Sequence, residues 1–272
     1  MNTTLAPGAI EPFELFAISY ARHSQRTNKD NFIGGDFHES SDLAYYVWVA
    51  RRGDRLFLID TGFGPDAAAA RGRELFQTPA QRLRGFGIDP AQIDDVILTH
   101  LHYDHAGTLA DFPKATFHVQ DSEAAYATGR CMCHGYLRQP FDVEDIVSYV
   151  RHLYGGRVAF HDGISQLADG LSLHRIGGHS AGLQVVRVWT RRGWVVIASD
   201  ASHLYANLND ANPFPVVYDV ASMLEGFRTV VRLADSEDHV IPGHDPMVMT
   251  LYPPVAADLE GQVFRLDVPP KV

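Results

Sequence analysis

Residues 100–105 read His100-Leu101-His102-Tyr103-Asp104-His105, and they are preceded by Thr99 and followed by Ala106-Gly107. Three imidazoles and one carboxylate thus fall within a very short segment. A regular helix or strand cannot direct all four side chains at one point, so we expect a loop after the apolar strand 96–98. Imidazole nitrogen and carboxylate oxygen are ligands that zinc and its neighbours prefer. The stretch therefore predicts a metal site, and the density of ligands favours two adjacent ions.

Three further residues of ligand type follow predicted strands. His179 comes after the strand 171–176, Asp200 after 194–198, and His244 after 239–241. Taken singly, each has an ordinary structural explanation as a turn cap, a helix cap or a hydrogen-bonded core residue. Loops at the carboxyl ends of neighbouring strands converge, however. Together with the first stretch these residues complete a set for two metals: His100, His102, Asp104, His105, His179, Asp200 and His244.

Length and composition restrict the class of protein. With 272 residues, 46% of them hydrophobic, the chain can bury a substantial core, and we expect one domain, 1–272, with a cap at 129–156. The net charge of −10 and the lack of a dense Lys/Arg run argue against nucleic acid as a partner.

Compartment is predicted from two further features of the sequence. We see neither an apolar run of membrane-spanning length nor a secretory signal pattern. Cys131 and Cys133 are too close together for a disulfide that would stabilise a secreted fold. We therefore expect a cytoplasmic protein without a membrane partner. Homodimerisation is expected only because many soluble enzymes form dimers.

The predicted elements alternate between strands and helices, which indicates an α+β protein. A polar stretch at 21–42 is expected to form an ordered loop or arm. The expected strands are 13–20, 43–49, 56–59, 96–98, 115–119, 171–176, 183–189, 194–198 and 239–241. The expected helices are 66–76, 80–84, a short one after Asp89, 121–128, 143–154 and 219–234.

The combined pattern resembles the metallo-β-lactamase superfamily, whose His-x-His-x-Asp-His loop, later His, later Asp and final His all have counterparts here. The resemblance implies a four-layer αβ/βα sandwich with the metals at one edge of two facing sheets. It assigns the first metal to His100, His102 and His179. It assigns the second metal to Asp104, His105 and His244, with Asp200 bridging both and Asp60 orienting a ligand histidine.

This ligand set predicts a hydrolase. Two divalent ions can hold a bridging hydroxide near neutral pH, which would attack a carbonyl group polarised by one metal. Asp200 would relay a proton to the leaving oxygen. Zinc is the expected metal, although iron, manganese and cobalt also suit mixed nitrogen and oxygen sites. The candidate catalytic residues are Asp104, Asp200 and His203.

Within the superfamily the chain looks most like the quorum-quenching N-acyl-homoserine lactonases. Those enzymes place a tyrosine three residues beyond the bridging aspartate, where this chain has His203, with Tyr205 close behind. An imidazole N–H can donate to the same substrate oxygen, while the structural alternative for His203 is a solvent-facing loop residue. Two other functions stay open: a catabolic hydrolase of another small lactone, cyclic amide or ester, and a non-catalytic metal-binding regulator.

Overall fold

Two β-sheets face each other in the computed structural model, which describes residues 10–36, 39 and 41–271. The larger sheet has the strand order β13-β1-β2-β3-β5-β6-β7, with β4 paired to β1. Its strands are β1 (Glu14–His23), β2 (Leu43–Arg52), β3 (Arg55–Ile59), β4 (Glu74–Leu75), β5 (Asp95–Ile97), β6 (Thr116–Gln120), β7 (Val158–His161) and β13 (Val263–Arg265). The smaller sheet has the order β12-β11-β10-β9-β8. Its strands are β8 (Ile164–Ala168), β9 (Leu171–Arg175), β10 (Gln184–Thr190), β11 (Gly193–Ser199) and β12 (Val240–Pro242).

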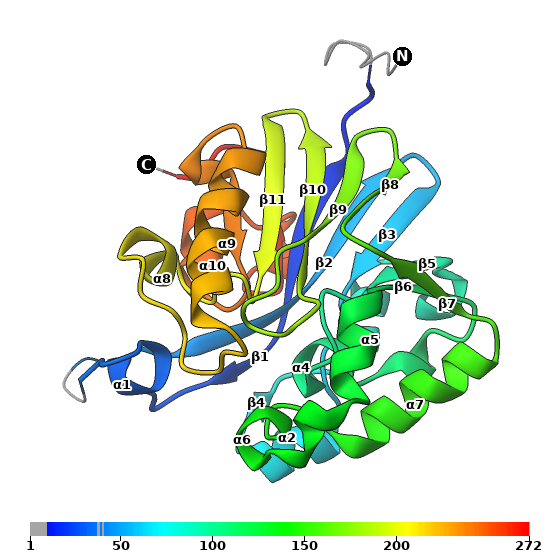
Figure 1. Ribbon diagram of the computed structural model, residues 1–272. Helices are drawn as coiled ribbons and strands as arrows, with labels where there is room; N and C mark the ends of the chain where they lie inside the picture. The colour runs from blue at the N-terminus through cyan, green and yellow to red at the C-terminus, as the bar shows by residue number, and fades with distance from the viewer. Residues whose placement is uncertain (1–9, 37–38, 40, 272) are drawn as a thin grey trace, which may run out of the picture.

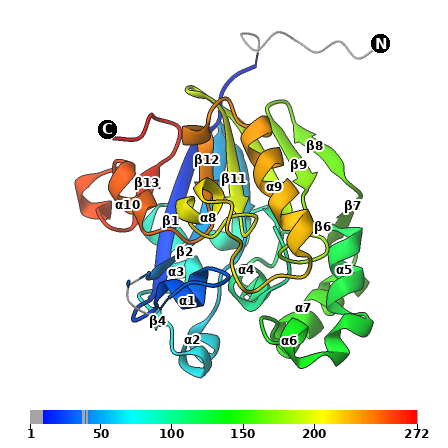
Figure 2. The ribbon, with the colours of Figure 1, turned by 60° about the vertical axis from the view of Figure 1, so that its left-hand side comes forward.

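The longer helices lie on the outer sides of the two sheets. The α-helices are α1 (Asn28–Asn31), α2 (Pro65–Arg71), α3 (Pro79–Gly85), α4 (Tyr103–Ala106), α5 (Asp121–Ala127), α6 (Gly135–Arg138), α7 (Val143–Tyr154), α8 (Tyr205–Asn209), α9 (Val220–Leu233) and α10 (Met247–Leu251). Figure 1 shows α9 outside β11, and α5 and α7 on the side of β5, β6 and β7. Figure 2 shows α9 and α8 in front of the smaller sheet. The arrangement is the predicted four-layer αβ/βα sandwich.

The buried side chains form separate layers, as alternation along the strands requires. On β10, Val186 and Val188 pack between the two sheets, where Trp48 is also fully buried. Val185 points the other way and packs with Val230 of α9. The hydrophobic layers therefore hold both sheets in place and leave their common edge for polar side chains.

Parallel strand pairs place the candidate ligands at that edge. β3 pairs with β5 in parallel, with Ile59 opposite Ile97, so Asp60 and the histidine stretch leave the larger sheet side by side. β11 pairs with β12 in parallel, with Ile197 opposite Ile241. Asp200 and His244 therefore emerge next to each other from the smaller sheet. The carboxyl ends of these strands meet, as they do in other open α/β sheets.

Several element predictions need correction. The histidine stretch is only partly a loop, because Asp104 and His105 lie on the short helix α4, which His102 precedes as N-cap. The helix predicted at 66–76 ends at Arg71, since Gly72 adopts φ +63° and closes it with a hydrogen bond to the preceding turn. The strand β4 then follows at Glu74–Leu75 and pairs with β1.

Other differences concern length and secondary-structure type. The short helix after Asp89 is a 3-10 turn, Pro90–Gln92. The predicted cap segment 129–156 contains another 3-10 turn, Arg130–Cys133, together with α6 and α7. The sequence did not predict β7, β8, β13, α8 or α10. Most of these elements are short, and a periodic pattern of that length does not distinguish a strand or helix from a loop. No helix in the described part of the chain is long and apolar enough to cross a membrane.

Candidate metal centre

The structure brings all seven predicted ligands into one cluster, joined by His203. Their candidate ligand atoms form overlapping groups in which every pair lies within 4.8 Å. These groups are His100-His102-His179, His100-His105-Asp200, Asp104-His105-His244 and His179-Asp200-His203. Apart from Asp104, which is partly exposed, all of these side chains are buried. So many adjacent imidazoles and carboxylates in one buried place are suited to cations rather than to packing.

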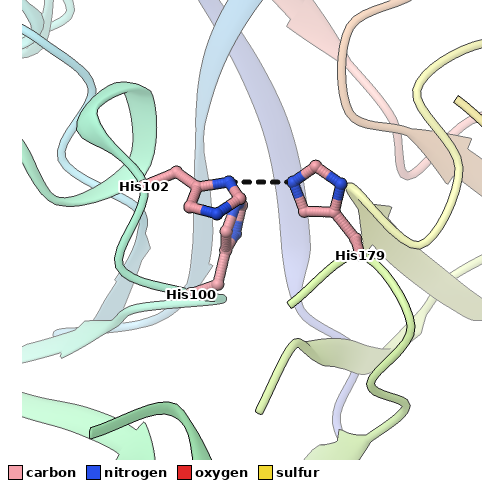
Figure 3. A group of neighbouring side chains, drawn as sticks. All are labelled: His100, His102 and His179. Carbon is pink, nitrogen blue, oxygen red and sulfur yellow. Dashed lines mark hydrogen bonds between the residues drawn. The ribbon is translucent and has the colours of Figure 1, made fainter. Parts of the chain in front are cut away.

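The first half of the cluster consists of three imidazoles from two loops. His102 Nδ1 lies 3.0 Å from His100 Nε2 and 2.9 Å from His179 Nε2. Figure 3 shows the three rings turned toward one another, with His179 arriving from the opposite side. Burial, reinforced by the neighbouring imidazoles, lowers the pKa of His100 and of His102 well below the ordinary value. These rings are therefore neutral at physiological pH, which is the form that binds a metal.

Asp200 lies between the two halves of the cluster. Its Oδ2 is 3.2 Å from His179 Nε2, and its Oδ1 is 3.3 Å from His105 Nε2 and 3.0 Å from His244 Nε2. The two oxygens of one carboxylate thus face different groups of imidazoles. Burial opposes ionisation of Asp200, but the surrounding imidazoles of His203, His105 and His244 outweigh it and hold its pKa well below the usual range.

The second half of the cluster favours positive charge. Asp104 Oδ1 lies 3.8 Å from His105 Nε2, and Asp104 Oδ2 lies 3.9 Å from His244 Nε2. Burial disfavours the charged form of His105, yet the carboxylates of Asp200, Asp60 and Asp104 raise the pKa of its ring well above the ordinary value. A divalent cation supplies the same positive charge at this position.

Unpartnered polar atoms test whether the cluster fits metal ions. Within the described residues, four buried atoms of the predicted ligands have no hydrogen-bond partner: His102 Nε2, His105 Nε2, Asp200 Oδ1 and His244 Nε2. A buried polar atom without a partner costs about 1–3 kcal/mol, so several in one cluster need a compensating ligand. Divalent cations fit His105, His244 and Asp200, whose unpartnered atoms face one another.

Outer hydrogen bonds fix the orientation of three histidines. His179 Nδ1 donates to the carbonyl of Val216 at 2.7 Å, and His244 Nδ1 donates to the carbonyl of Ala44 at 3.0 Å. His105 Nδ1 donates to Asp60 Oδ2 at 2.8 Å. Because these oxygens accept, each ring holds a proton on Nδ1, and its Nε2 points into the cluster.

Asp60 occupies the supporting position that the sequence predicted. It is fully buried, has φ +62°, and accepts hydrogen bonds from both the backbone N–H and the hydroxyl of Thr99. A non-glycine residue in the left-handed region costs of order 1–3 kcal/mol and persists where surrounding contacts hold it. Asp60 therefore links the end of β3 to the histidine stretch and to His105 in particular.

Glu123 is a structural residue of the site that sequence reasoning missed. Its fully buried carboxylate accepts from the backbone N–H of Leu101 at 3.0 Å, the hydroxyl of Ser180 at 2.7 Å and the backbone N–H of Gly182 at 2.9 Å. It thus joins the loop of His100 and His102 to the loop of His179. Glu123 comes from α5, and a glutamate in a short helix carries no sequence signal for this role.

His203 is buried rather than solvent-facing, so the structural alternative considered for it is wrong. The residue is only 3% exposed, and its ring stacks on Phe214 with the centroids 3.6 Å apart. His203 Nε2 lies 3.0 Å from Asp200 Oδ2, while Nδ1 has no partner within the described residues. Burial lowers the pKa of His203 to about 3. The ring is therefore neutral and has one N–H to donate.

A cavity of about 140 Å³ opens onto the cluster. His102, Asp104, His179, Asp200, His203 and His244 form its floor. The rest of its lining includes residues that sequence reasoning did not select: Arg26, Asp30, Leu43, Tyr45, Arg71, Arg73, Tyr103, Gln139, Pro140, Phe214 and Val216. Among these, Gln139 and Pro140 come from the predicted cap segment, and Arg26 and Asp30 come from the predicted arm. Tyr20 of β1 is fully buried behind this lining, and its hydroxyl donates to the backbone carbonyl of Asp104.

Fold, cluster and sequence together define the class of protein. Residues 41–244 match the family model of the Metallo-beta-lactamase superfamily, and this chain belongs to that superfamily. The resemblance inferred from the ligand pattern is thereby confirmed.

Two relatives and one solved structure show what this chain is similar to. The N-acyl homoserine lactonase AiiB of Agrobacterium fabrum is 27% identical over 223 residues, which cover 75% of this chain and 80% of that protein. The N-acyl homoserine lactonase AttM of the same organism is 30% identical over 174 residues, covering 61% of this chain and 63% of that protein. A crystal structure of a quorum-quenching N-acyl homoserine lactone lactonase superposes with a TM-score of 0.73 at 22% identity, over 87% of this chain and 94% of the other. That likeness supports the fold.

Proposed function

We propose that this protein is a hydrolase that uses two divalent metal ions to open a lactone ring. The observation that carries the proposal is the Asp200 carboxylate, whose two oxygens face separate groups of imidazoles. His100, His102 and His179 would hold one ion, and Asp104, His105 and His244 the other, with Asp200 between them. Zinc suits this mixture of nitrogen and oxygen ligands, as do iron, manganese and cobalt. A non-catalytic regulator would bind the same ions without turnover.

The protein's own residues have distinct tasks in this proposal. When bound, the two ions would supply hydroxide at neutral pH and polarise the substrate carbonyl. Asp200 stays ionised and can accept a proton and pass it to the leaving oxygen. His203 lines the cavity, and its single N–H faces Asp200 Oδ2 from Nε2 at 3.0 Å. Once a bound ion takes that oxygen, this N–H would be free to donate to the carbonyl oxygen of the substrate.

Two substrate classes are to be compared. The names of the relatives favour N-acyl homoserine lactones. The small cavity favours a compact lactone, cyclic amide or ester, because pockets for larger ligands usually measure about 300–1,000 Å³.

The first test is proton release at constant pH from protein with a verified content of two metals per chain. The substrates are N-acyl homoserine lactones with short and long acyl chains, and unsubstituted γ- and δ-lactones. We expect release from lactones, and the preferred compound identifies the substrate class. No release from any lactone or ester by the fully loaded protein would contradict the proposal.

His203→Phe tests the assigned donor. Because phenylalanine keeps the stacking on Phe214 but removes the N–H, we expect turnover to fall about a hundredfold while both metals stay bound. Turnover and metal content are measured on the same preparation. His174→Phe makes the same exchange on β9 outside the cavity and serves as the control. An unchanged rate in the His203 variant would exclude this residue from the reaction.

A further inference from the structure

Three arginines line the cavity beside the metal cluster. Arg26, Arg71 and Arg73 are each partly buried there. Within the described residues, none of the three has a carboxylate oxygen within the 4.0 Å of an ion pair, although other arginines of the chain do. The whole protein carries 33 acidic and only 23 basic residues, so a group of unpaired arginines does not follow from composition. Their positive charge is directed at the cavity.

Neutral groups hold these guanidinium groups in place. Arg26 donates to the side-chain oxygen of Asn31 at 2.8 Å and to the backbone carbonyl of Asp30 at 2.7 Å. Arg73 donates to the hydroxyl of Tyr103 at 3.0 Å. The carboxylate of Asp30 itself accepts from the backbone N–H and hydroxyl of Thr27. These contacts orient the arginines. The carboxylates of Asp30 and Asp104 act on Arg26 and Arg73 through their charge, but neither is within ion-pair distance.

Arg71 is held in the same way. Its two terminal nitrogens donate to the backbone carbonyls of Gln139 and Phe141, and its guanidinium lies 3.9 Å from the ring centroid of Tyr103. Both carbonyls belong to the segment 129–156. Arg71 therefore ties α2 to that segment. Arg26 and Arg73 instead meet at one side chain, His23, and form a pair at the cavity.

His23 lies between that pair and cannot satisfy both arginines. Arg26 Nη1 is 3.2 Å from His23 Nδ1, and Arg73 Nη1 is 3.2 Å from His23 Nε2. Burial and the two adjacent guanidinium groups lower the pKa of His23 to about 4, so the ring is neutral. A neutral imidazole accepts at only one nitrogen. The ring therefore turns an N–H toward one of the two arginines. Arg73 Nη1 has a second acceptor in the backbone carbonyl of Arg71, whereas Arg73 Nη2 makes no hydrogen bond within the described residues.

The pair also adjoins the metal cluster. The guanidinium of Arg26 lies 5.6 Å from the ring centroid of Phe214, which stacks on His203. On the other side, Arg73 donates to Tyr103, the residue directly before Asp104. The cluster and the two arginines therefore line one cavity.

We propose that the substrate carries an anionic group, most simply a carboxylate, that binds to Arg26 and Arg73 while its reacting carbonyl lies at the metal cluster. This inference rests on the proposed hydrolase function and specifies its substrate as a small anionic lactone or related ester. Guanidinium groups match oxyanions through paired N–H donors, and such charge-assisted hydrogen bonds are the strong ones. The bound oxyanion would accept from the guanidinium N–H groups that the protein leaves unused, Arg73 Nη2 among them.

The test compares two γ-lactones of nearly equal shape: 5-oxotetrahydrofuran-2-carboxylate and its neutral carboxamide. With the metal-loaded enzyme we expect kcat/KM to be at least about tenfold higher for the carboxylate. Arg26→Gln and Arg73→Gln should each reduce this ratio toward one. Arg228→Gln removes an equal charge from the outside of α9 and should leave the ratio unchanged. Equal values for the two lactones, or a ratio that survives both substitutions, would overturn the proposal.

A binding measurement separates failure of this inference from failure of the hydrolase proposal. The thermal midpoint of the loaded protein is measured with benzoate, inorganic phosphate and benzamide. We expect benzoate to raise the thermal midpoint and benzamide to leave it unchanged. The rise should be smaller in Arg73→Gln, and also in Arg73→Lys, which keeps the positive charge but loses the paired N–H donors of the guanidinium group. A rise in the thermal midpoint without hydrolysis of any lactone would refute the proposed hydrolase function but support the anion-binding site. A larger rise with phosphate would assign the site to phosphate instead of carboxylate, and no rise with either anion would refute the site.

Discussion

Replacing Asp200 with asparagine is expected to reduce the metal content from two ions per chain to one or fewer and to lower hydrolysis by at least about a thousandfold. The reason is the position of its carboxylate. Oδ2 lies 3.2 Å from His179 Nε2, and Oδ1 lies 3.0 Å from His244 Nε2. An amide keeps one acceptor oxygen and turns an N–H₂ group toward the other set of imidazoles. That group cannot bind a cation.

The experiment measures metal content after dialysis and the rate of proton release from the best lactone. Asp245→Asn is the matched control, because Asp245 is also a buried carboxylate in the neighbouring loop but caps the backbone N–H groups of Tyr205 and Met247. It should retain two metals even if its stability falls. Two retained metals and a full rate in the Asp200 variant would exclude the bridging role.

Replacing Glu123 with alanine is expected to lower the free energy of unfolding by about 3–5 kcal/mol and to weaken metal binding. Three donors lose their acceptor at once: the backbone N–H groups of Leu101 and Gly182 and the hydroxyl of Ser180. Solvent cannot readily replace the acceptor, because the site is fully buried. An added Cβ at Gly182 would lie 2.2 Å from the backbone nitrogen of Glu123, so this contact leaves no spare room.

Urea unfolding measures the stability, and metal titration of the folded protein measures the affinity. Ser180→Ala removes one of the three hydrogen bonds and should cost only about 1 kcal/mol. Glu123→Gln keeps the size and one acceptor oxygen, so its metal affinity should lie between those of the wild type and the alanine variant. A stability loss without any change in metal affinity would limit Glu123 to folding and contradict its role in positioning the histidine loops.

Much of the metal cluster was predictable from sequence because its signal is local. His100, His102, Asp104 and His105 stand together in the chain, and the remaining ligands each follow a recognisable apolar strand. Strand ends in such folds converge, so the residue types and their positions were sufficient to predict the fold and to nominate the ligands. Short elements such as β7 and β8 were missed because their patterns are too brief to separate strand from loop.

The surroundings of the cluster depend on contacts between distant parts of the chain. Arg26 and Arg73 meet at His23 from two separate segments, and Phe214 brings a third to the same cavity. Glu123 serves two histidine loops from a helix with no distinctive motif. Arginines and glutamates are common on protein surfaces, and their sequence neighbours do not indicate what they face. The local sequence therefore largely determines which residues are the candidate metal ligands. Packing between the sheets and loops determines the charge and size of the cavity, and these decide the substrate class.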